Sequence, residues 1–157
     1  WRVSGEVAQT MRRVYPLMRT GMQEHAMKSH HRLAAGSPKQ YQGRIAEDHA
    51  LRWLLQAGHQ LVARNYHCRA GEIDLITLSA ANVLVFTEVR WRRNLAYGGA
   101  LASVTLSKQR RLIVTARHFL ACHPVNQIRA MRFDVFGLTG LPPHWQCHWI
   151  RGAFAAA

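Results

Sequence analysis

The chain has 157 residues, of which 48% are hydrophobic and 18% are charged; this is enough for one domain with an ordinary core and too short for a multidomain machine. Its 21 lysines and arginines outnumber its 8 aspartates and glutamates, for a formal net charge of +13, so polyanions are the expected partners. The longest aliphatic and aromatic run, Val83 to Phe86, falls far short of the ~18 residues that a membrane-spanning helix needs. We therefore expect a soluble protein that does not bind membranes.

Residues 1–40 differ in composition from the rest of the chain. They hold four of the five methionines and seven basic residues, with only Glu6 and Glu24 as acids. We expect a basic, poorly ordered extension here and a single folded domain over 41–157. A transit peptide, a start placed upstream of the true one and a nucleic-acid-binding arm are alternatives that the sequence leaves open.

From residue 41 onward, apolar periodicity and turn residues mark the secondary structure. The predicted order is αβββαβ with one further strand, which is an α/β fold built on a mixed sheet flanked by helices. The apolar stripes of the two helices include Leu54 and Leu55 in the first, and Leu106 and Ala116 in the second. The predicted elements are a helix over 41–57, strands over 60–64, 72–78 and 83–91, a helix over 104–121, and strands over 132–138 and 145–150, with turns at 65–71 and 80–82 and a glycine loop at 97–99.

The cysteines and histidines are candidate metal ligands, and the cysteines are also candidate disulfide partners. Cys68, Cys122 and Cys147 are an odd number with no secretory signal ahead of them, which favours free thiols in a reducing compartment, the cytoplasm. Cysteine and histidine are neighbours at 122–123 and again over 144–148, but neither segment has the paired short spacing of a zinc site. Scattered histidines and thiols are therefore the preferred interpretation.

Acids are scarce from residue 41 onward, yet three of the six lie in the two strands of the predicted hairpin: Glu72, Asp74 and Glu88. If the connecting loop is 80–82, then residues 79 and 83 pair, and Asp74 lies opposite Glu88. Asn82 suits the left-handed position of such a loop. A loop one residue longer would place the two carboxylates on opposite faces of the sheet.

Two facing carboxylates destabilise a sheet unless a cation lies between them. Mg²⁺ or Mn²⁺, which prefers carboxylate oxygens, would reverse the sign of that interaction. Glu47 lies on the same face of the first helix as the apolar stripe, so its side chain points toward the sheet. A buried acid there needs a cationic or hydrogen-bonding partner. The alternative is structural: Glu47, Asp74 and Glu88 could each pair with a neighbouring arginine.

Several motifs in this order resemble the YraN family of uncharacterised bacterial proteins. They are Gly71-Glu-Ile-Asp-Leu-Ile76, Val85-Phe-Thr-Glu-Val-Arg-Trp-Arg92, Tyr97-Gly-Gly99, Lys108 and Arg132-Phe-Asp-Val135, and the resemblance spans about 43–137. That family is similar to the PD-(D/E)XK nuclease superfamily, with its restriction-endonuclease-like fold, and within it to archaeal Holliday junction resolvases.

The resemblance implies a metal-dependent active site. Asp74 corresponds to the first acid of the superfamily's active-site motif, and Glu88-Val89-Arg90 corresponds to its E-x-K part. Glu47 corresponds to the acid on the first helix of resolvase-type members. The three acids would hold Mg²⁺ or Mn²⁺, and Arg90 replaces the usual lysine. An arginine can stabilise charge on a phosphate, but it cannot take a proton.

Basic residues near this site are candidate nucleic-acid ligands. Arg92 and Arg93 end the strand that carries Glu88, and Lys108, Arg110 and Arg111 cluster in the first turns of the second helix. The alternative for these residues is a solvated helix face. Of the neighbouring aromatic residues, Trp91 and Tyr97 could stack on bases, although a core position is the preferred interpretation for Trp91.

The sequence thus predicts a nucleic-acid-binding protein, with DNA favoured over RNA, that acts as a magnesium-dependent, resolvase-like endonuclease. A homodimer would suit symmetric cleavage of two strands. The first alternative is a non-catalytic nucleic-acid-binding module with a degenerate site, which the arginine at position 90 favours. The second alternative is a basic assembly protein of the ribosome type.

Overall fold

The computed structural model describes residues 37–93, 104–127, 129–142 and 144–156. Most of the expected extension over 1–40 and the glycine loop at 97–99 lie outside these residues. No helix within the described ranges is long and apolar enough to cross a membrane, and Cys68, Cys122 and Cys147 are free thiols. The elements are helix α3 (Pro38–Gln56), strands β1 (Gln60–Cys68), β2 (Gly71–Leu78) and β3 (Leu84–Arg92), helix α4 (Leu106–Cys122), the 3-10 turn η2 (Pro124–Asn126), and strands β4 (Met131–Thr139) and β5 (Gln146–Phe154).

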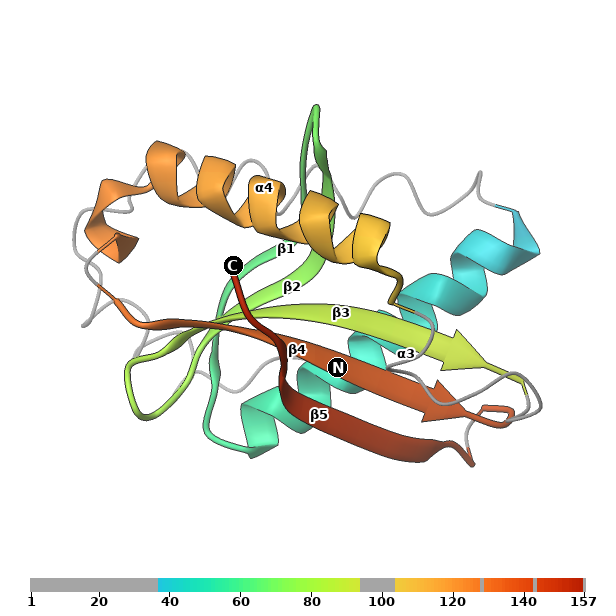
Figure 1. The fold of residues 1–157 in the computed structure, drawn as a ribbon. Helices are drawn as coiled ribbons and strands as arrows, with labels where there is room; N and C mark the ends of the chain where they lie inside the picture. The colour runs from blue at the N-terminus through green and yellow to red at the C-terminus, as the bar shows by residue number, and fades with distance from the viewer. Residues whose placement is uncertain (1–36, 94–103, 128, 143, 157) are drawn as a thin grey trace. The chain divides into compact units, whose positions relative to one another are not determined.

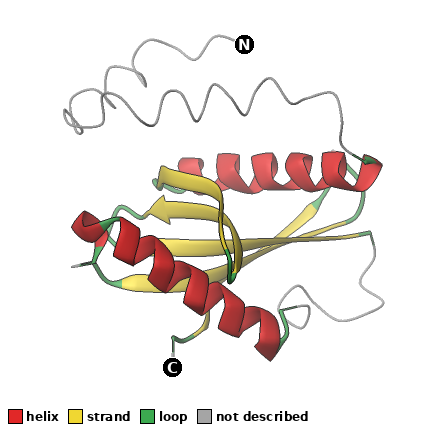
Figure 2. Ribbon diagram, turned by 90° about the horizontal axis from the view of Figure 1, so that it is seen from above, coloured by secondary structure: helices red, strands yellow, loops and turns green. Residues whose placement is uncertain are grey.

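The strands form one sheet in the order β1-β2-β3-β4-β5. Only β3 and β4 are parallel, and α4 connects them; the other neighbours are antiparallel. Figures 1 and 2 show α3 against one face of the sheet and α4 against the other. The predicted α/β class with a mixed sheet flanked by helices is confirmed, and the architecture is consistent with a restriction-endonuclease-like fold.

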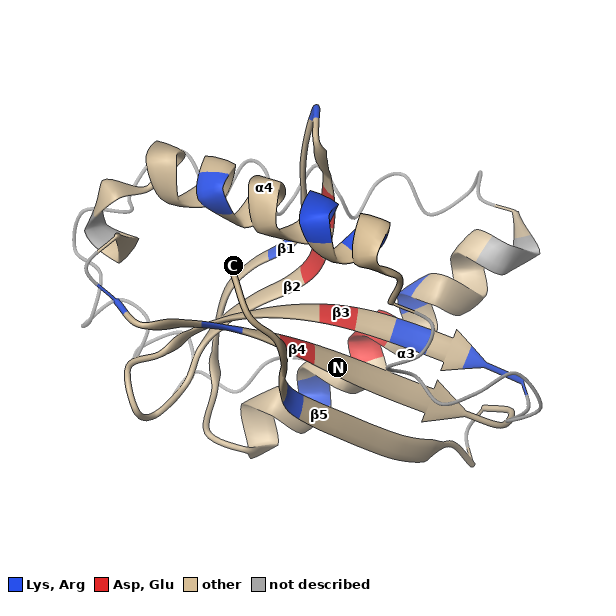
Figure 3. Ribbon diagram, in the orientation of Figure 1, with Lys and Arg blue, Asp and Glu red and all other residues tan. Residues whose placement is uncertain are grey.

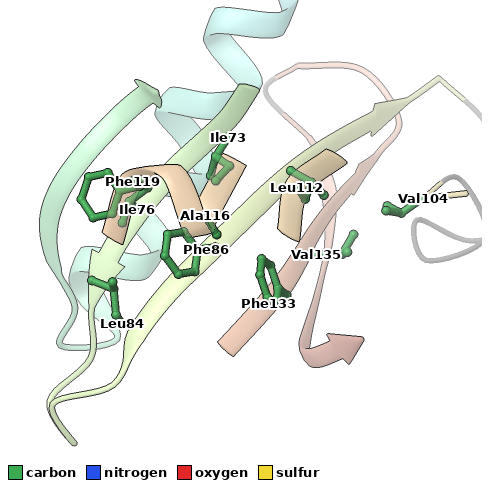
Figure 4. Close-up of a cluster of buried hydrophobic side chains, with 10 residues drawn as sticks. All are labelled: Ile73, Ile76, Leu84, Phe86, Val104, Leu112, Ala116, Phe119, Phe133 and Val135. Atoms are coloured by element: carbon green, nitrogen blue, oxygen red, sulfur yellow. The ribbon is translucent and has the colours of Figure 1, made fainter. Parts of the chain in front are cut away.

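Each helix closes its own hydrophobic cluster. Under α4, Phe119 packs edge-on against Phe86 of the sheet, and Phe86 stacks on Phe133 (Figure 4). Under α3, the alanines at 46 and 50 let the helix approach the sheet closely, with Leu54 in the same buried line. Two predicted core positions are wrong: Leu55 and Leu106 are 45% and 71% exposed, because the buried stripe of each helix is rotated away from them.

Strand β1 runs further than the sequence predicts. The expected turn over 65–71 is reduced to residues 69 and 70, because Cys68 still pairs with Gly71 and His67 with Glu72. Asn65 has a positive φ of 51°, a conformation that asparagine tolerates better than most residues. It bends the strand where a turn was predicted while the backbone pairing continues on both sides.

The outer boundaries also shift. Helix α3 begins at Pro38, a residue that suits the first helical position because its missing N–H would have no partner there. Strand β5 continues to Phe154, since an irregularity between Phe133 and Val135 lets it remain paired with β4.

The β2–β3 hairpin has the predicted register. Leu78 pairs with Leu84 and Leu75 with Thr87, and the Ser79 amide donates to the Val83 carbonyl at 2.9 Å. Asn82 has φ 59°, as a three-residue loop of this kind requires. The register that brings Asp74 toward Glu88 is therefore confirmed.

Asp134, to which the sequence assigned no catalytic or binding role, is the most fully satisfied carboxylate in the described residues. It is 1% exposed and accepts hydrogen bonds from Arg132 Nε at 2.7 Å and Nη2 at 3.0 Å. Trp149 Nε1 donates to it at 3.0 Å and the Gly152 amide at 2.9 Å. These bonds fasten β5 to β4, so Asp134 has a structural role.

We expect Asp134→Ala to lower the free energy of unfolding by about 3 kcal/mol, because the buried carboxylate is lost and the Trp149 indole N–H, the Gly152 amide and the Arg132 guanidinium lose their acceptor. Urea denaturation followed by circular dichroism measures it. The control is Asp48→Ala, which removes an exposed ion pair with Arg64 and should cost less than about 1 kcal/mol. Equal losses in the two variants would contradict the structural role of Asp134.

Candidate active site

Asp74 lies where the β1–β2 hairpin twists away from β3. Ile73 and Ile76 both contact the cluster under α4, whereas Leu75 contacts the cluster under α3, so the simple alternation of faces is interrupted at residue 74. The β2–β3 ladder ends at Leu75. Beyond it, Asp74 Oδ2 accepts a 2.7 Å hydrogen bond from the Val89 amide, in the place of a strand carbonyl.

Glu88 lies beside it on β3 and is only 3% exposed. Its Oε1 atom is 3.2 Å from Lys108 Nζ and 3.4 Å from Arg90 Nε. Its Oε2 atom is buried and accepts no hydrogen bond from any described residue. A buried acceptor without a donor is costly, so this oxygen is the atom of the site that most needs a ligand.

Both carboxylates have a raised pKa. Burial raises the pKa of Asp74 to about 8, with help from the charge of Glu88 and against the stabilising Val89 amide. Burial also raises the pKa of Glu88, although Lys108 and Arg90 oppose the shift. The site therefore stores electrostatic repulsion that a proton or a cation relieves.

Glu47 approaches from α3 but is held by other groups. Arg64 Nη2 is 3.4 Å from Glu47 Oε2, and the same guanidinium reaches Asp48 at 2.8 Å. Burial raises the pKa of Glu47 against the opposing charge of Arg64 and a hydrogen bond from Asn65. The arginine pairing left open by the sequence is thus present. Among the described residues, no three His, Cys, Asp or Glu side chains converge as metal ligands.

The basic residues divide into two groups. Lys108 and Arg111 line a hollow beside the β1–β2 hairpin, and Figure 3 shows the basic first half of α4 beside the acidic positions of β2 and β3. Arg92, Arg93 and Arg110 are exposed elsewhere on the surface. As expected for a core position, Trp91 packs against the cluster under α3 and donates Nε1 to the Gly140 carbonyl at 2.9 Å.

The sequence did not reveal that Lys108 reaches the carboxylates. It predicted a phosphate ligand on the second helix, but the 3.2 Å contact with Glu88 depends on how α4 crosses the sheet. It also assigned no role to Glu72, whose charge raises the pKa of both Glu47 and Glu88. The spacing of two between Glu72 and Asp74 was the available signal.

Comparison with known proteins connects this geometry to a family. A sequence model described as "Uncharacterised protein family UPF0102" matches residues 46–138, more than half of the chain. The chain belongs to the UPF0102 family. This confirms the YraN resemblance, because the two names denote the same family.

Bacterial UPF0102 proteins align over most of their own length. One from Alcanivorax borkumensis is 54% identical over 119 residues, covering 74% of this chain and 93% of that protein. One from Ralstonia nicotianae is 49% identical, covering 71% and 85%, and one from a Psychrobacter species is 48% identical, covering 76% and 92%. The UPF0102 match contains Glu47, Asp74, Glu88, Arg90 and Lys108.

We expect Asp74→Asn to stabilise the protein at alkaline pH. Folding raises the pKa of Asp74 from 3.8 to about 8, so wild type loses stability relative to the variant as the pH rises through this interval. The difference should grow by up to ~1.4 kcal/mol per pH unit and disappear below about pH 4. Urea denaturation of both proteins from pH 4 to 9 measures it; a difference independent of pH would rule the shift out.

Proposed function

We propose that this UPF0102 protein is a metal-dependent nuclease that hydrolyses phosphodiester bonds, with an active site of the PD-(D/E)XK type. The observation that carries the proposal is the pair Asp74 and Glu88: two carboxylates with raised pKa values beneath a basic helix, one of them with a buried oxygen that has no donor among the described residues. If Glu88 were only part of a structural ion pair, both of its carboxylate oxygens would have donors, as both oxygens of Asp134 have. One oxygen of Glu88 has none among the described residues.

The donors fit a hard divalent cation. Asp74 and Glu88 would hold Mg²⁺ or Mn²⁺ with the Val89 carbonyl, and Glu47 would join them on exchanging Arg64 for the ion. When bound, the ion supplies an activated water and compensates negative charge on the scissile phosphate. The raised pKa values support this fit, since a cation lowers the free energy of two facing carboxylates.

The remaining chemistry belongs to the basic side chains. Lys108 neutralises Glu88 and lies at the edge of the surface hollow, where it can bind a phosphate oxygen. Arg90 shares Glu88 with it and can hold charge on the phosphate. Neither acts as the base for the water: arginine does not release its proton at neutral pH, and Lys108 is engaged in an ion pair with Glu88.

We propose DNA as the substrate, bound through its phosphates by Arg92, Arg93, Lys108, Arg110 and Arg111. Such contacts give an affinity that falls with salt and depends little on base sequence. A dimer would allow two strands to be cut symmetrically. The charge of the chain, +13, supports a polyanionic ligand.

The second candidate is a nucleic-acid-binding module without turnover. Arg90 and Lys108 both contact Glu88, so the carboxylate is partly neutralised by the protein's own cations, as in a site that has ceased to bind metal. Calorimetry and cleavage assays separate the two candidates.

Asp74→Ala should abolish cleavage of plasmid, single-stranded and four-way-junction DNA in Mg²⁺ or Mn²⁺ while leaving DNA binding equal or tighter. The reason is that a metal ligand is lost and a negative charge facing phosphate disappears. Gel assays of cleavage and fluorescence anisotropy of binding measure the two effects. If wild type and variant bind DNA equally and neither cuts any substrate, the binding module is the correct function.

Glu88→Gln should remove Mn²⁺ binding measured by isothermal titration calorimetry, because a buried amide cannot replace the carboxylate charge. Asp48→Asn is the matched control and should bind as wild type does. Wild-type affinity should increase with pH up to about 8, as protons leave Asp74. Identical titrations of wild type and Glu88→Gln would exclude the metal site.

Arg90→Lys should retain or raise the cleavage rate, since it restores the lysine of the E-x-K motif, whereas Arg90→Ala should lower the rate by about tenfold or more. Single-turnover cleavage at saturating protein isolates this effect from binding. A faster reaction in the alanine variant than in the lysine variant would show that no cation is needed at this position.

A further inference from the structure

A hollow of about 370 Å³ lies between the tip of the β1–β2 hairpin and the first turns of α4. We name it the hairpin pocket; it is lined by His67, Cys68, Gly71, Glu72, Lys108 and Arg111. Its volume is at the lower end of the range for small-ligand sites, on the order of 300–1,000 Å³. That is room for more than one phosphate oxygen and too little for a folded partner.

The hairpin and the helix meet closely because residue 71 is glycine. A Cβ atom on Gly71 would lie 3.2 Å from Thr115 Oγ1, which is tighter than an ordinary contact, and 3.5 Å from Arg111 Cβ. Cys68 Sγ also contacts Thr115 Oγ1 at 3.8 Å. The hairpin therefore rests directly on α4, and the pocket beside this contact has walls from both elements.

The charge of the pocket favours an anion. Lys108 and Arg111 are three residues apart on α4 and so lie on neighbouring positions of one helix face. Arg111 forms no ion pair with any residue in the described ranges. Glu72 is the one acid of the lining against these two cations.

Lys108 joins the hairpin pocket to the carboxylate pair. Its ammonium group is 3.2 Å from Glu88 Oε1 and its side chain is 25% exposed, while the same residue lines the pocket. An anion in the pocket is thus adjacent to the Asp74–Glu88 site. A guanidinium such as that of Arg111 binds phosphate through two parallel hydrogen bonds.

We propose that the hairpin pocket binds a phosphate group of a nucleic-acid strand, held by Arg111 and Lys108, next to the phosphate at the carboxylate pair. This assignment rests on the proposed function and adds to it a defined subsite for the strand. The ligand can be an internal phosphodiester or a terminal monophosphate, which share the same oxyanion chemistry.

The chain offers a matched pair of variants for the test. Arg110 and Arg111 are adjacent, exposed arginines of α4, but only Arg111 lines the pocket. In EDTA, where no cleavage occurs, the dissociation constant of a fluorescent single-stranded oligonucleotide should rise about tenfold in Arg111→Ala and no more than about threefold in Arg110→Ala. Glu72→Gln should tighten binding, because it removes the acid that faces the phosphate.

The reactivity of the Cys68 thiol reports whether the hairpin pocket is occupied. The Ala70 amide donates to its sulfur at 3.4 Å and lowers the pKa of the thiol, while burial raises the pKa of Cys147. Mass spectrometry of iodoacetamide-treated protein should therefore show that the oligonucleotide protects Cys68 and leaves Cys147 unaffected. The protection should require higher oligonucleotide concentrations in Arg111→Ala.

Three arms identify the source of the phosphate: a 5′-phosphorylated oligonucleotide, its 5′-hydroxyl counterpart and inorganic phosphate. Equal protection by the two oligonucleotides supports an internal phosphodiester, and protection by the phosphorylated one and by inorganic phosphate supports a terminal group. Equal losses in Arg110→Ala and Arg111→Ala without Cys68 protection would overturn the pocket while nucleic-acid binding stands. If wild type binds no oligonucleotide, the proposed function itself fails.

Discussion

The hydrogen bond from the Val89 amide to Asp74 is the interaction on which the site depends. It replaces a strand-to-strand bond where β2 separates from β3, and so it both ends the β2–β3 ladder and fixes a carboxylate beside Glu88. The bond favours the charged form of Asp74, whereas burial and the charge of Glu88 disfavour that form. A carboxylate at this position therefore lowers the stability of the fold. A cost of this kind is typical of functional sites.

The same sheet contains a carboxylate of the opposite kind, and the comparison separates structure from function. Asp134 is as deeply buried as Glu88, yet its oxygens receive hydrogen bonds from a guanidinium, an indole and an amide. Glu88 has cationic side chains at one carboxylate oxygen, whereas the other oxygen accepts no hydrogen bond from a described residue. Burial alone therefore does not identify a candidate site; the unsatisfied oxygen does.

The cations around Glu88 come from two directions. Arg90 is supplied by the same strand, two residues on, and Lys108 by the helix that covers this face. A lysine ammonium is thus present beside the acid although the strand itself carries arginine. The helix also contributes to the hairpin pocket, so α4 links the acid pair to the basic surface.

Local sequence patterns determined much of this protein. The alternation in β2 and β3 and the asparagine at position 82 were sufficient for the hairpin register, and helical periodicity located both helices, because these signals act over a few residues. The predicted ends of strands β1 and β5 were wrong, because they depend on long-range pairing. Strand β1 continues through Asn65 since β2 remains paired with β1 there, and β5 is longer than predicted because β4 accommodates an irregularity.

Only the tertiary structure decided which charged groups meet. The sequence placed Asp74 near Glu88 through the register, but whether Glu47 binds an ion or an arginine depended on Arg64, 17 residues away in the chain. Likewise, Lys108 contacts Glu88 because α4 crosses above β3, and no spacing in the sequence encodes that crossing. Hydrogen bonds within a hairpin are local and can be counted from the residues, whereas ion pairs between a helix and a sheet depend on how the packed layers are oriented.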